Sequence, residues 1–386
     1  MKYQFDYIVI GVGSMGSSTC FHLAKSGATV LGIEQFELAH ENGAHSGQSR
    51  IVRKAYFEHP DYIPLLERAY QNWGEIEHIS GNKLYHQTGL FYTAPKGHPI
   101  IENIRDAAKS YNIPLLDSKH QDEVAILPLF SVPNDYEWIY EPEAGFVETD
   151  KTILTYIKEA KKLGATIHQH ERVIDWQVSN DGVSVKTDKD TYTCRKIIVT
   201  AGPWSAKLMP SINDQLKITR QTLMWMQPEE QGCFHSTRFP CWFVVDKGKP
   251  GAYYGFPISA INDQKNPNGF KFAYHYPAIE TDPDKVNRDI SEQDKEPLLK
   301  FIEQYIPKAK GQVLGVKTCL YSNSSDEHFV IDFLPHTEQK VCFARGFSGH
   351  GFKFVSVIGE VMADLALKGT TSLPIGFLGA NRFNKV

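Results

Sequence analysis

The chain has 386 residues, a formal net charge of −4 and a hydrophobic content of 41%, which predicts a globular protein of two or three domains without a nucleic-acid or anionic-membrane partner. No apolar run approaches the roughly 20 residues that cross a bilayer, and no signal peptide is apparent. The six cysteines form no CxxC pair and the histidines lack ligand spacing, so we expect reduced thiols, a cytoplasmic protein and no metal site.

The N-terminal segment carries a complete β-turn-α-β pattern. It consists of Tyr7–Ile10, the turn Gly11–Gly16, a helix to about Ser26, Thr29–Ile33 and an acid, Glu34. Gly11 allows the tight turn, Gly13 lets the backbone approach a pyrophosphate, and Gly16 permits close packing of helix and strand. The helix N-terminus favours phosphate, and Glu34 can bind ribose hydroxyls, which argues against a 2′-phosphate. The pattern therefore predicts a dinucleotide site for FAD or NAD.

The rest of the chain alternates between helical and strand patterns. Helices are expected at Ile63–His78, Ile101–Tyr111, Asp150–Gly164 and Asp294–Tyr305, with a last helix to about Leu367. Strands are expected at Thr166–Val173, Gly182–Lys186, Lys196–Thr200, Phe329–Ile331 and Val341–Ala344. Three aromatic-rich alternating segments, Trp242–Val245, Tyr253–Phe256 and Gly269–His275, predict a separate antiparallel sheet.

Four further segments carry a family resemblance. They are Gly43–Arg53, Tyr253–Pro257, Lys317–Tyr321 with Asp326–His328, and Gly346–Phe354. With the N-terminal turn they resemble, end to end, the monomeric sarcosine oxidase and N-methyltryptophan oxidase family within the glycine and D-amino-acid oxidase fold.

The resemblance implies an α/β plus α+β architecture and a monomer. A discontinuous, Rossmann-like FAD-binding domain would comprise residues 1–88, 145–218 and 325–386, and an antiparallel-sheet substrate domain residues 89–144 and 219–324. The flavin would lie between the two domains.

Cys319 matches the cysteine that forms a thioether to the flavin ring in this family. The alternative is a buried core cysteine, which is the usual state of a free cysteine and our expectation for the other five. The motif around Cys319 favours covalent FAD.

Two basic residues match the family's substrate-carboxylate pair, and a third matches its oxygen-activating lysine. Arg53 and Lys353 have the side-chain chemistry to bind a planar anion. The alternative is that both are exposed on the surface, as most Arg and Lys residues are. Lys271 would stabilise developing superoxide charge beside the flavin. Its alternation with Phe270 and Phe272 fits a solvent-facing strand lysine equally well.

The remaining site residues also follow from the resemblance. Tyr254 and His275 would line the substrate pocket, with a core tyrosine and a plain strand histidine as the alternatives. Arg50 and Tyr321 would lie close to the flavin ring. Further FAD contacts are expected from Ser49, Val173, Ala201, Gly202, Trp204, Gly349, His350, Gly351 and Lys353.

Taken together, these matches predict an oxidase of a small secondary amino acid such as sarcosine. Amine and dioxygen would give an imine, which hydrolyses, and hydrogen peroxide. Ser46 and Gln48 replace a histidine and an acid of many family members, and Trp242 and Phe243 either form apolar walls of the pocket or pack in the core. A bulkier N-methyl, cyclic (pipecolate-like) or glycated amino acid therefore stays open as substrate. An NAD-dependent dehydrogenase or a non-catalytic flavin-binding protein are the alternatives from other classes.

Overall fold

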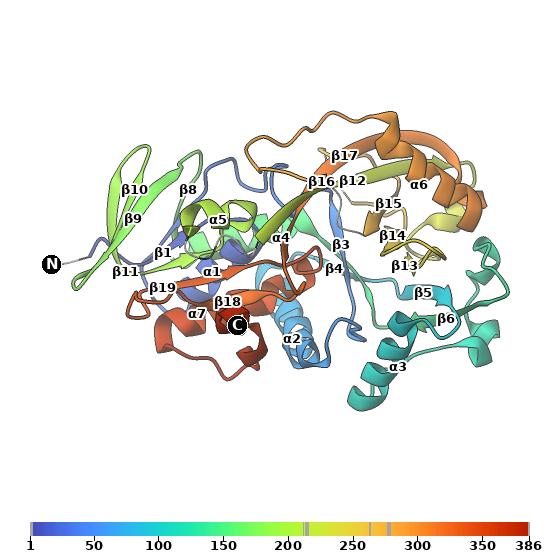
Figure 1. Ribbon diagram of the computed structural model, residues 1–386, viewed down its shortest axis with the longest axis horizontal. Helices are drawn as coiled ribbons and strands as arrows, with labels where there is room; N and C mark the ends of the chain where they lie inside the picture. Colours follow the sequence, from blue (N-terminus) through green and yellow to red (C-terminus); the bar gives the residue numbers. More distant parts are fainter. Residues whose placement is uncertain (1–2, 211, 213–215, 262–263, 276–278, 385–386) are drawn as a thin grey trace.

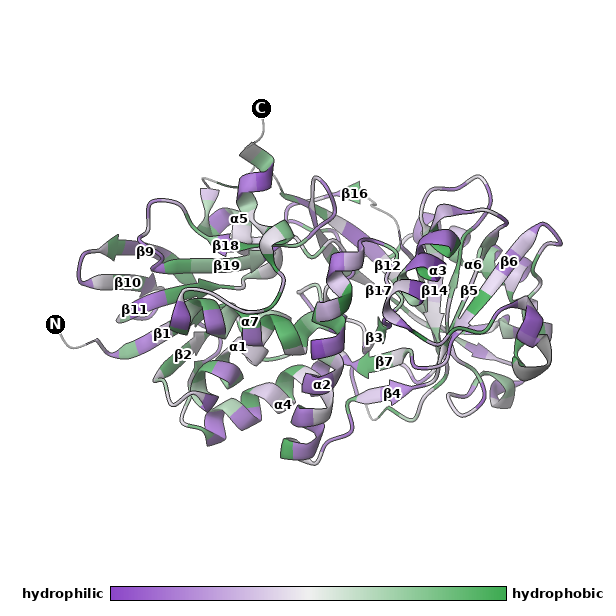
Figure 2. Ribbon diagram, turned by 90° about the horizontal axis from the view of Figure 1, so that it is seen from below, coloured by the Kyte–Doolittle hydropathy of each residue, from purple (hydrophilic) through white to green (hydrophobic). Residues whose placement is uncertain are grey.

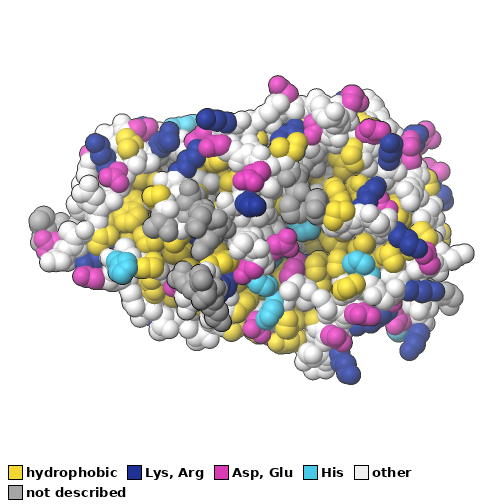
Figure 3. All heavy atoms as spheres, in the orientation of Figure 1, with side chains coloured by type: hydrophobic (Ala, Val, Ile, Leu, Met, Phe, Trp, Pro, Cys, Tyr) yellow, Lys and Arg dark blue, Asp and Glu magenta, His cyan; other side chains and the backbone are white. Residues whose placement is uncertain are grey.

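A computed structural model describes residues 3–210, 212, 216–261, 264–275 and 279–384. Two large sheets lie side by side along the long axis of the molecule, one at each end (Figure 1). Acidic and basic side chains are interspersed over the face in Figure 3, without a large patch of one sign. In the described part of the chain, none of the helices has the length and apolar character needed to cross a membrane.

The first sheet contains the predicted dinucleotide unit. Its strands run in the order β18-β19-β11-β1-β2-β8, with β10 and β9 continuing from β11, and the β19-β11-β1-β2-β8 pairs are all parallel. The bounds are β1 Phe5–Ile10, β2 Val30–Ile33, β8 Thr166–His168, β9 Val173–Ser179, β10 Gly182–Thr187, β11 Thr191–Val199, β18 Val330–Phe333 and β19 Val341–Arg345. The central strands are apolar without alternation because both of their faces are covered.

Four helices pack together beside this sheet: α1 (Ser14–Lys25), α2 (Ile63–Ser80), α4 (Thr149–Lys162) and α7 (Val355–Lys368). α1 contacts both α4 and α7, and α7 also contacts α2, β11 and β19. Because α7 is covered on most sides, it is apolar almost all round, as Figure 2 shows. It ends at Gly369, whose φ of 75° suits a left-handed C-cap.

The second sheet has the order β16-β12-β15-β14-β13-β5-β6, with β17 on the other side of β12. The bounds are β5 Leu90–Pro95, β6 Tyr136–Glu141, β12 Leu216–Pro228, β13 Cys241–Val244, β14 Ala252–Phe256, β15 Phe270–His275, β16 Ile279–Glu280 and β17 Gly311–Ser324. All pairs are antiparallel except β13 with β5. Helices α3 (Pro99–Tyr111) and α6 (Glu292–Tyr305) contact strands of this sheet. α6 begins with a capping box between Ser291 and Asp294.

A small third sheet, β3-β7-β4, lies between the two large ones (Figure 2). Its strands are β3 Ser49–Val52, β4 Tyr85–Gln87 and β7 Gly145–Glu148. β3 is part of the Gly43–Arg53 segment and pairs with β7, which also pairs with β4.

The predicted fold class is confirmed, with differences in detail. The expected strand Thr166–Val173 is wrong: β8 ends at His168 and β9 begins at Val173, because the chain turns at His170, which has a φ of 54°. Sequence patterns also missed the full length of β12 and β17 and the whole of the small sheet. The division into two discontinuous domains remains a proposal, and its boundary at residue 218 falls inside β12.

Candidate active site

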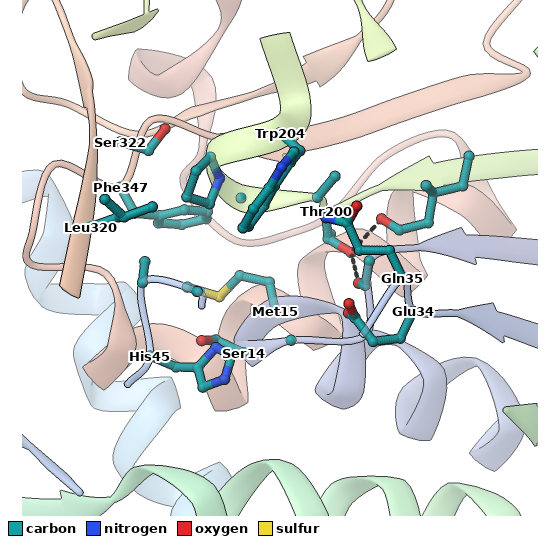
Figure 4. A pocket seen from close by; sticks show the side chains of 18 of the residues that line it. Ser14, Met15, Glu34, Gln35, His45, Thr200, Trp204, Leu320, Ser322 and Phe347 are labelled. Carbon is teal, nitrogen blue, oxygen red and sulfur yellow. Dashed lines mark hydrogen bonds between the residues drawn. The ribbon is translucent and has the colours of Figure 1, made fainter. Parts of the chain in front are cut away.

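A cavity of about 570 Å³ opens at the carboxyl ends of β1, β2 and β11, where α1 begins. This edge of a parallel sheet is where α/β proteins generally bind their ligands. Figure 4 shows Glu34 and Gln35 at one end of the cavity and Leu320 and Phe347 at the other, with Trp204 facing Met15 across it.

The glycines of the turn before α1 have the geometry expected of a dinucleotide site. Gly11 has a φ of 88°, and a Cβ there would lie 2.7 Å from Ala201 Cα. A Cβ on Gly16 would lie only 1.9 Å from Gly11 O, so Gly16 permits the close packing of α1 on the turn. Gly13 is the N-cap of α1 and lines the cavity, where its backbone is open to a ligand.

Glu34 is fixed at the end of β2. Its carboxylate accepts hydrogen bonds from Val12 N at 3.0 Å and Phe36 N at 3.1 Å, and His40 Nε2 lies 3.5 Å from Oε1. The side chain is buried yet lines the cavity. A preoriented carboxylate in this position suits the hydroxyls of a ribose.

Two buried polar atoms in the cavity wall need a ligand. Within the described part of the chain, His45 Nε2 and Ser322 Oγ have no hydrogen-bond partner, although both residues line the cavity. Unsatisfied buried polar atoms are costly, which is the state expected where a polar ligand binds. Together with the helix N-terminus and Glu34, they fit a diphosphate-containing dinucleotide such as FAD.

The sequence-predicted cofactor residues gather here with a few exceptions. Those that line the cavity are Gly11, Gly13, Glu34, Arg50, Val173, Ala201, Gly202, Trp204, Tyr321, Gly349 and Gly351. His350 and Lys353 line a second, smaller pocket instead. Gly16, Ser49 and Cys319 are described but stand outside the residues that line either cavity. The roles of all these residues remain proposals.

The second pocket has a volume of about 60 Å³ and adjoins the first, since Arg50, Gly349 and Phe352 line both. It brings together most of the predicted catalytic residues. Its other walls are Ile51, Arg53, Phe57, Glu58, Leu90, Phe243, Tyr254, His275, His350 and Lys353. No group of three or more His, Cys, Asp or Glu residues among the described residues is arranged to hold a metal ion.

Arg53 is buried and forms an ion pair with Glu58. Its Nη2 lies 2.5 and 2.7 Å from the two Glu58 oxygens, and its guanidinium stacks 4.2 Å from the ring centre of Tyr56 and 4.1 Å from that of Phe57. Burial acts to raise the pKa of Glu58, but Arg53, His350 and Lys353 outweigh it and lower the pKa to about 2. The alternative of an exposed arginine is wrong.

Lys353 is also buried, and its Nζ donates to His350 O at 2.8 Å. Burial and the nearby Arg53 charge lower the pKa of Lys353 to about 7, although Glu58 opposes this shift. Three basic side chains, Arg50, Arg53 and Lys353, and one carboxylate, Glu58, thus line the pocket, and the exposed-lysine alternative is wrong as well.

Two histidines in the pocket are held neutral by their surroundings. His275 Nδ1 lies 3.0 Å from Tyr321 Oη, and burial lowers the pKa of His275 to about 4. His350 hydrogen-bonds Tyr56 Oη through Nδ1 and Glu327 O through Nε2 at 2.9 Å, and burial lowers its pKa to about 3. The Glu327 carbonyl can only accept, so the His350 proton is on Nε2 and Tyr56 donates to Nδ1.

Lys271 is 1% exposed, so the solvent-facing alternative is wrong. Its Nζ donates to Gly47 O, to Ser49 O at 2.7 Å and to Ser49 Oγ at 3.1 Å, and it lies 4.2 Å from the ring centre of Phe256. The turn that precedes Arg50 therefore anchors this lysine. Ser49 contacts Lys271, not the cavity.

Cys319 lies in β17 opposite Gln221 of β12 and is fully buried. Burial raises the pKa of its thiol, while the charges of Arg50, Lys271 and Arg288 act in the opposite direction. Its neighbours Leu320 and Tyr321 line the large cavity. A core cysteine and a tether are both compatible with this position.

Sequence reasoning missed Glu58, Tyr56 and His45. Glu58 could have been found from the sequence, because it is an acidic residue five positions after Arg53, the predicted anion-binding arginine. Trp242 was wrongly considered for the pocket wall: it stacks on Phe301 at 5.5 Å in the core, whereas Phe243 lines the pocket. Adjacent strand residues point to opposite faces, so only one of Trp242 and Phe243 can face the pocket.

This fold and this pair of cavities are those of a dinucleotide-binding protein, and sequence comparison identifies its family. A family model described as FAD dependent oxidoreductase matches residues 6–365. The chain therefore belongs to the FAD-dependent oxidoreductase family.

Curated relatives agree across the full length. The chain is 35% identical to a monomeric sarcosine oxidase of Bacillus sp. (strain NS-129), covering 99% of this chain and 98% of the relative. It is 31% identical to an N-methyl-L-tryptophan oxidase of Yersinia pestis (strain Pestoides F), covering 98% and 100%. The resemblance inferred from the motifs is thus confirmed, as is FAD in preference to NAD.

Solved structures show the same fold. An L-proline dehydrogenase from P. horikoshii superposes with a TM-score of 0.84 at 19% identity, covering 100% of this chain and 99% of that one. NikD, an amino acid oxidase of nikkomycin biosynthesis, superposes with a TM-score of 0.82 at 22% identity, covering 97% of each chain.

Proposed function

We propose that the protein oxidises the C–N bond of a small secondary amino acid such as sarcosine, with dioxygen as the electron acceptor. The products are hydrogen peroxide and an imine, which hydrolyses. The observation that carries the proposal is the meeting of two buried cations, Arg53 and Lys353, in a small pocket that joins the dinucleotide cavity at Arg50 and Gly349.

Arg53 and Lys353 bind the substrate carboxylate. Arg53 is already paired with the carboxylate of Glu58, and a substrate carboxylate offers the same planar acceptor. Lys353, which comes from near the other end of the sequence, adds a second positive charge to the same pocket. Phe57, Leu90 and Phe243 supply apolar walls, and a pocket of about 60 Å³ favours a small substrate.

Neither His275 nor Tyr254 is required as a base, because the amine reacts in its neutral form. Burial keeps His275 neutral, with its pKa lowered to about 4, and burial raises the pKa of Tyr254 above its usual value. Bound FAD supplies the two-electron acceptor for the C–N oxidation. His275, Tyr254 and Tyr321 therefore orient the substrate and exclude water.

Arg50 provides positive charge in the wall of the dinucleotide cavity, and Lys271 provides it behind the turn that precedes Arg50. Lys271 is held by the Gly47–Ser49 turn, and Arg50 by the carbonyls of Ser49, Ala44 and Ser46 at 2.8, 3.0 and 2.6 Å. Fixed cations stabilise negative charge that develops during dioxygen reduction.

FAD is attached covalently through Cys319 in this proposal. The three cations near its thiol favour the thiolate that such a bond requires, against the effect of burial. We also propose that the chain acts as a cytoplasmic monomer, in keeping with its unpaired cysteines and the word monomeric in the names of its relatives. The domain division at residues 88, 144, 218 and 324 belongs to the same proposal.

A bulkier substrate is the second candidate. The aromatic side chains Phe57 and Phe243, whose ring centres lie 5.6 Å apart, flank the pocket and suit an apolar N-methyl amino acid. One relative is named N-methyl-L-tryptophan oxidase and one solved structure is an L-proline dehydrogenase, so cyclic substrates are tested alongside.

The test is the absorption spectrum of the purified protein before and after acid precipitation, followed by anaerobic addition of sarcosine. Yellow colour should stay in the pellet, and sarcosine should bleach the native protein. In Cys319→Ala the colour should move to the supernatant; colour that stays in the pellet would exclude the tether. Bleaching by N-methyltryptophan or proline but not by sarcosine would identify the second candidate, and no bleaching by any of them would refute the proposed reaction.

A further inference from the structure

Glu141 is a fully buried acid at the end of β6, outside both cavities as their walls are described. Its carboxylate receives three hydrogen bonds. Oε1 accepts from Lys54 N at 2.6 Å and Ala55 N at 3.3 Å, and Oε2 accepts from Tyr92 Oη at 3.2 Å. All three partners are donors, so they fit an ionised carboxylate.

The two backbone donors belong to the segment that carries Arg53. The β3–β7 ladder ends at Val52, so the next amide groups need acceptors from elsewhere. Glu141 supplies these acceptors for Lys54 and Ala55. The carbonyl of Ala55 in turn accepts a hydrogen bond from Arg53 Nη1 at 3.2 Å.

Arg53 therefore has two kinds of contact. Nη2 binds the carboxylate of Glu58, and Nη1 binds the backbone that Glu141 immobilises. When a substrate carboxylate takes the place of Glu58, the Nη1 contact is the one that can persist. An arginine fork binds a carboxylate well only if its plane is held at the correct angle.

We propose that Glu141 is a positioning residue for substrate binding: by fixing the Lys54–Ala55 backbone it holds the Arg53 guanidinium in the orientation that receives the substrate carboxylate. This inference rests on the function proposed above, because it assumes that Arg53 binds that carboxylate. Glu141 itself touches neither the substrate nor the cofactor.

Two conservative variants separate this role from a contribution of charge alone. Glu141→Asp keeps the charge but shortens the side chain by one methylene group, so the carboxylate no longer reaches both amides. Glu141→Gln loses the charge but its amide oxygen can still accept from Lys54 N and Ala55 N. Glu143→Gln is the matched control, because the Glu143 carboxylate pairs with the Lys54 side chain at 2.7 Å and not with the Lys54 and Ala55 amides.

The measurements are the KM and kcat for sarcosine and the dissociation constant of acetate, followed through the flavin absorbance of the holoenzyme. Glu141→Asp should raise the KM and the acetate dissociation constant about tenfold with a nearly unchanged kcat. Glu141→Gln and Glu143→Gln should stay within about threefold of the unmodified protein.

Equal losses in Glu141→Asp and Glu141→Gln, or a loss of kcat without a rise in KM, would overturn the inference, as would an Asp variant with normal acetate binding. Arg53→Met provides the separate check on the underlying function. If Arg53→Met leaves acetate binding unchanged, the assignment of Arg53 to the carboxylate fails. If Arg53→Met weakens binding but Glu141→Asp does not, only the role of Glu141 fails.

Discussion

Arg53 and Glu58 form a buried ion pair in the smaller pocket, with Arg53 Nη2 2.5 and 2.7 Å from the two carboxylate oxygens. The side chains are 6% and 17% exposed. Glu58 thus occupies the Arg53 guanidinium, to which the proposed substrate carboxylate would bind. Binding of an anion therefore competes with an internal carboxylate.

Glu58→Gln should strengthen anion binding and weaken the fold. Without the internal competitor, acetate should bind several-fold more tightly, while the buried guanidinium loses its charged partner and the free energy of unfolding falls by about 2 kcal/mol. Titration with acetate and thermal denaturation measure the two effects. Saturating acetate should recover part of the lost stability; weaker acetate binding in the variant would contradict the competition.

Acetate affinity should depend on pH through Lys353, whose pKa burial and Arg53 lower to about 7. Lys353 is protonated below that value and neutral above it, so the acetate dissociation constant should rise as the pH increases through about 7. The rise should level off at the dissociation constant of the form with neutral Lys353, in which Arg53 still binds the anion. Lys353→Met should bind acetate weakly, with little pH dependence over about 2 pH units around neutrality. A persistent slope in this variant would assign the titration to another group.

Lys271→Met should slow the reoxidation of reduced flavin by dioxygen by about a hundredfold or more, because it removes a fixed buried cation. Reduction by substrate should change far less, because Arg53 and Lys353, and not Lys271, are the proposed partners of the substrate carboxylate. Stopped-flow absorbance measures both half-reactions separately. Ser49→Ala removes only the contact between Lys271 Nζ and Ser49 Oγ and serves as the mild control. Equal losses in both half-reactions would exclude a specific role with oxygen.

Gly16→Ala should abolish FAD incorporation or folding, because its Cβ would lie 1.9 Å from Gly11 O. Gly74 is the control: it also lies in a helix, and a Cβ there meets nothing within 4 Å. Gly74→Ala should stabilise the protein by about 0.5–1 kcal/mol with a normal flavin content. The ratio of flavin to protein absorbance and the thermal midpoint report the outcome. Normal flavin in Gly16→Ala would show that the turn can relax.

The dinucleotide unit can be predicted from local sequence alone. The apolar run of β1, the glycines of the turn, and Glu34 after β2 are contiguous, and each follows from local sterics or hydrogen bonding. Alternation was also sufficient to identify β14 and β15. The family motifs then named Arg53 and Lys353, which no local pattern distinguishes from surface residues.

The burial of these side chains and their contacts depend on how distant segments meet in the folded chain. Alternation places Lys271 opposite Phe270 and Phe272, but its burial depends on the Gly47–Ser49 turn that covers it. Arg53 pairs directly with Glu58, which is close in sequence. It also depends on the distant Glu141, which binds the backbone next to it. Side-chain periodicity fixes the face of a strand, whereas burial and charge pairing arise from segments that meet only when the chain has folded.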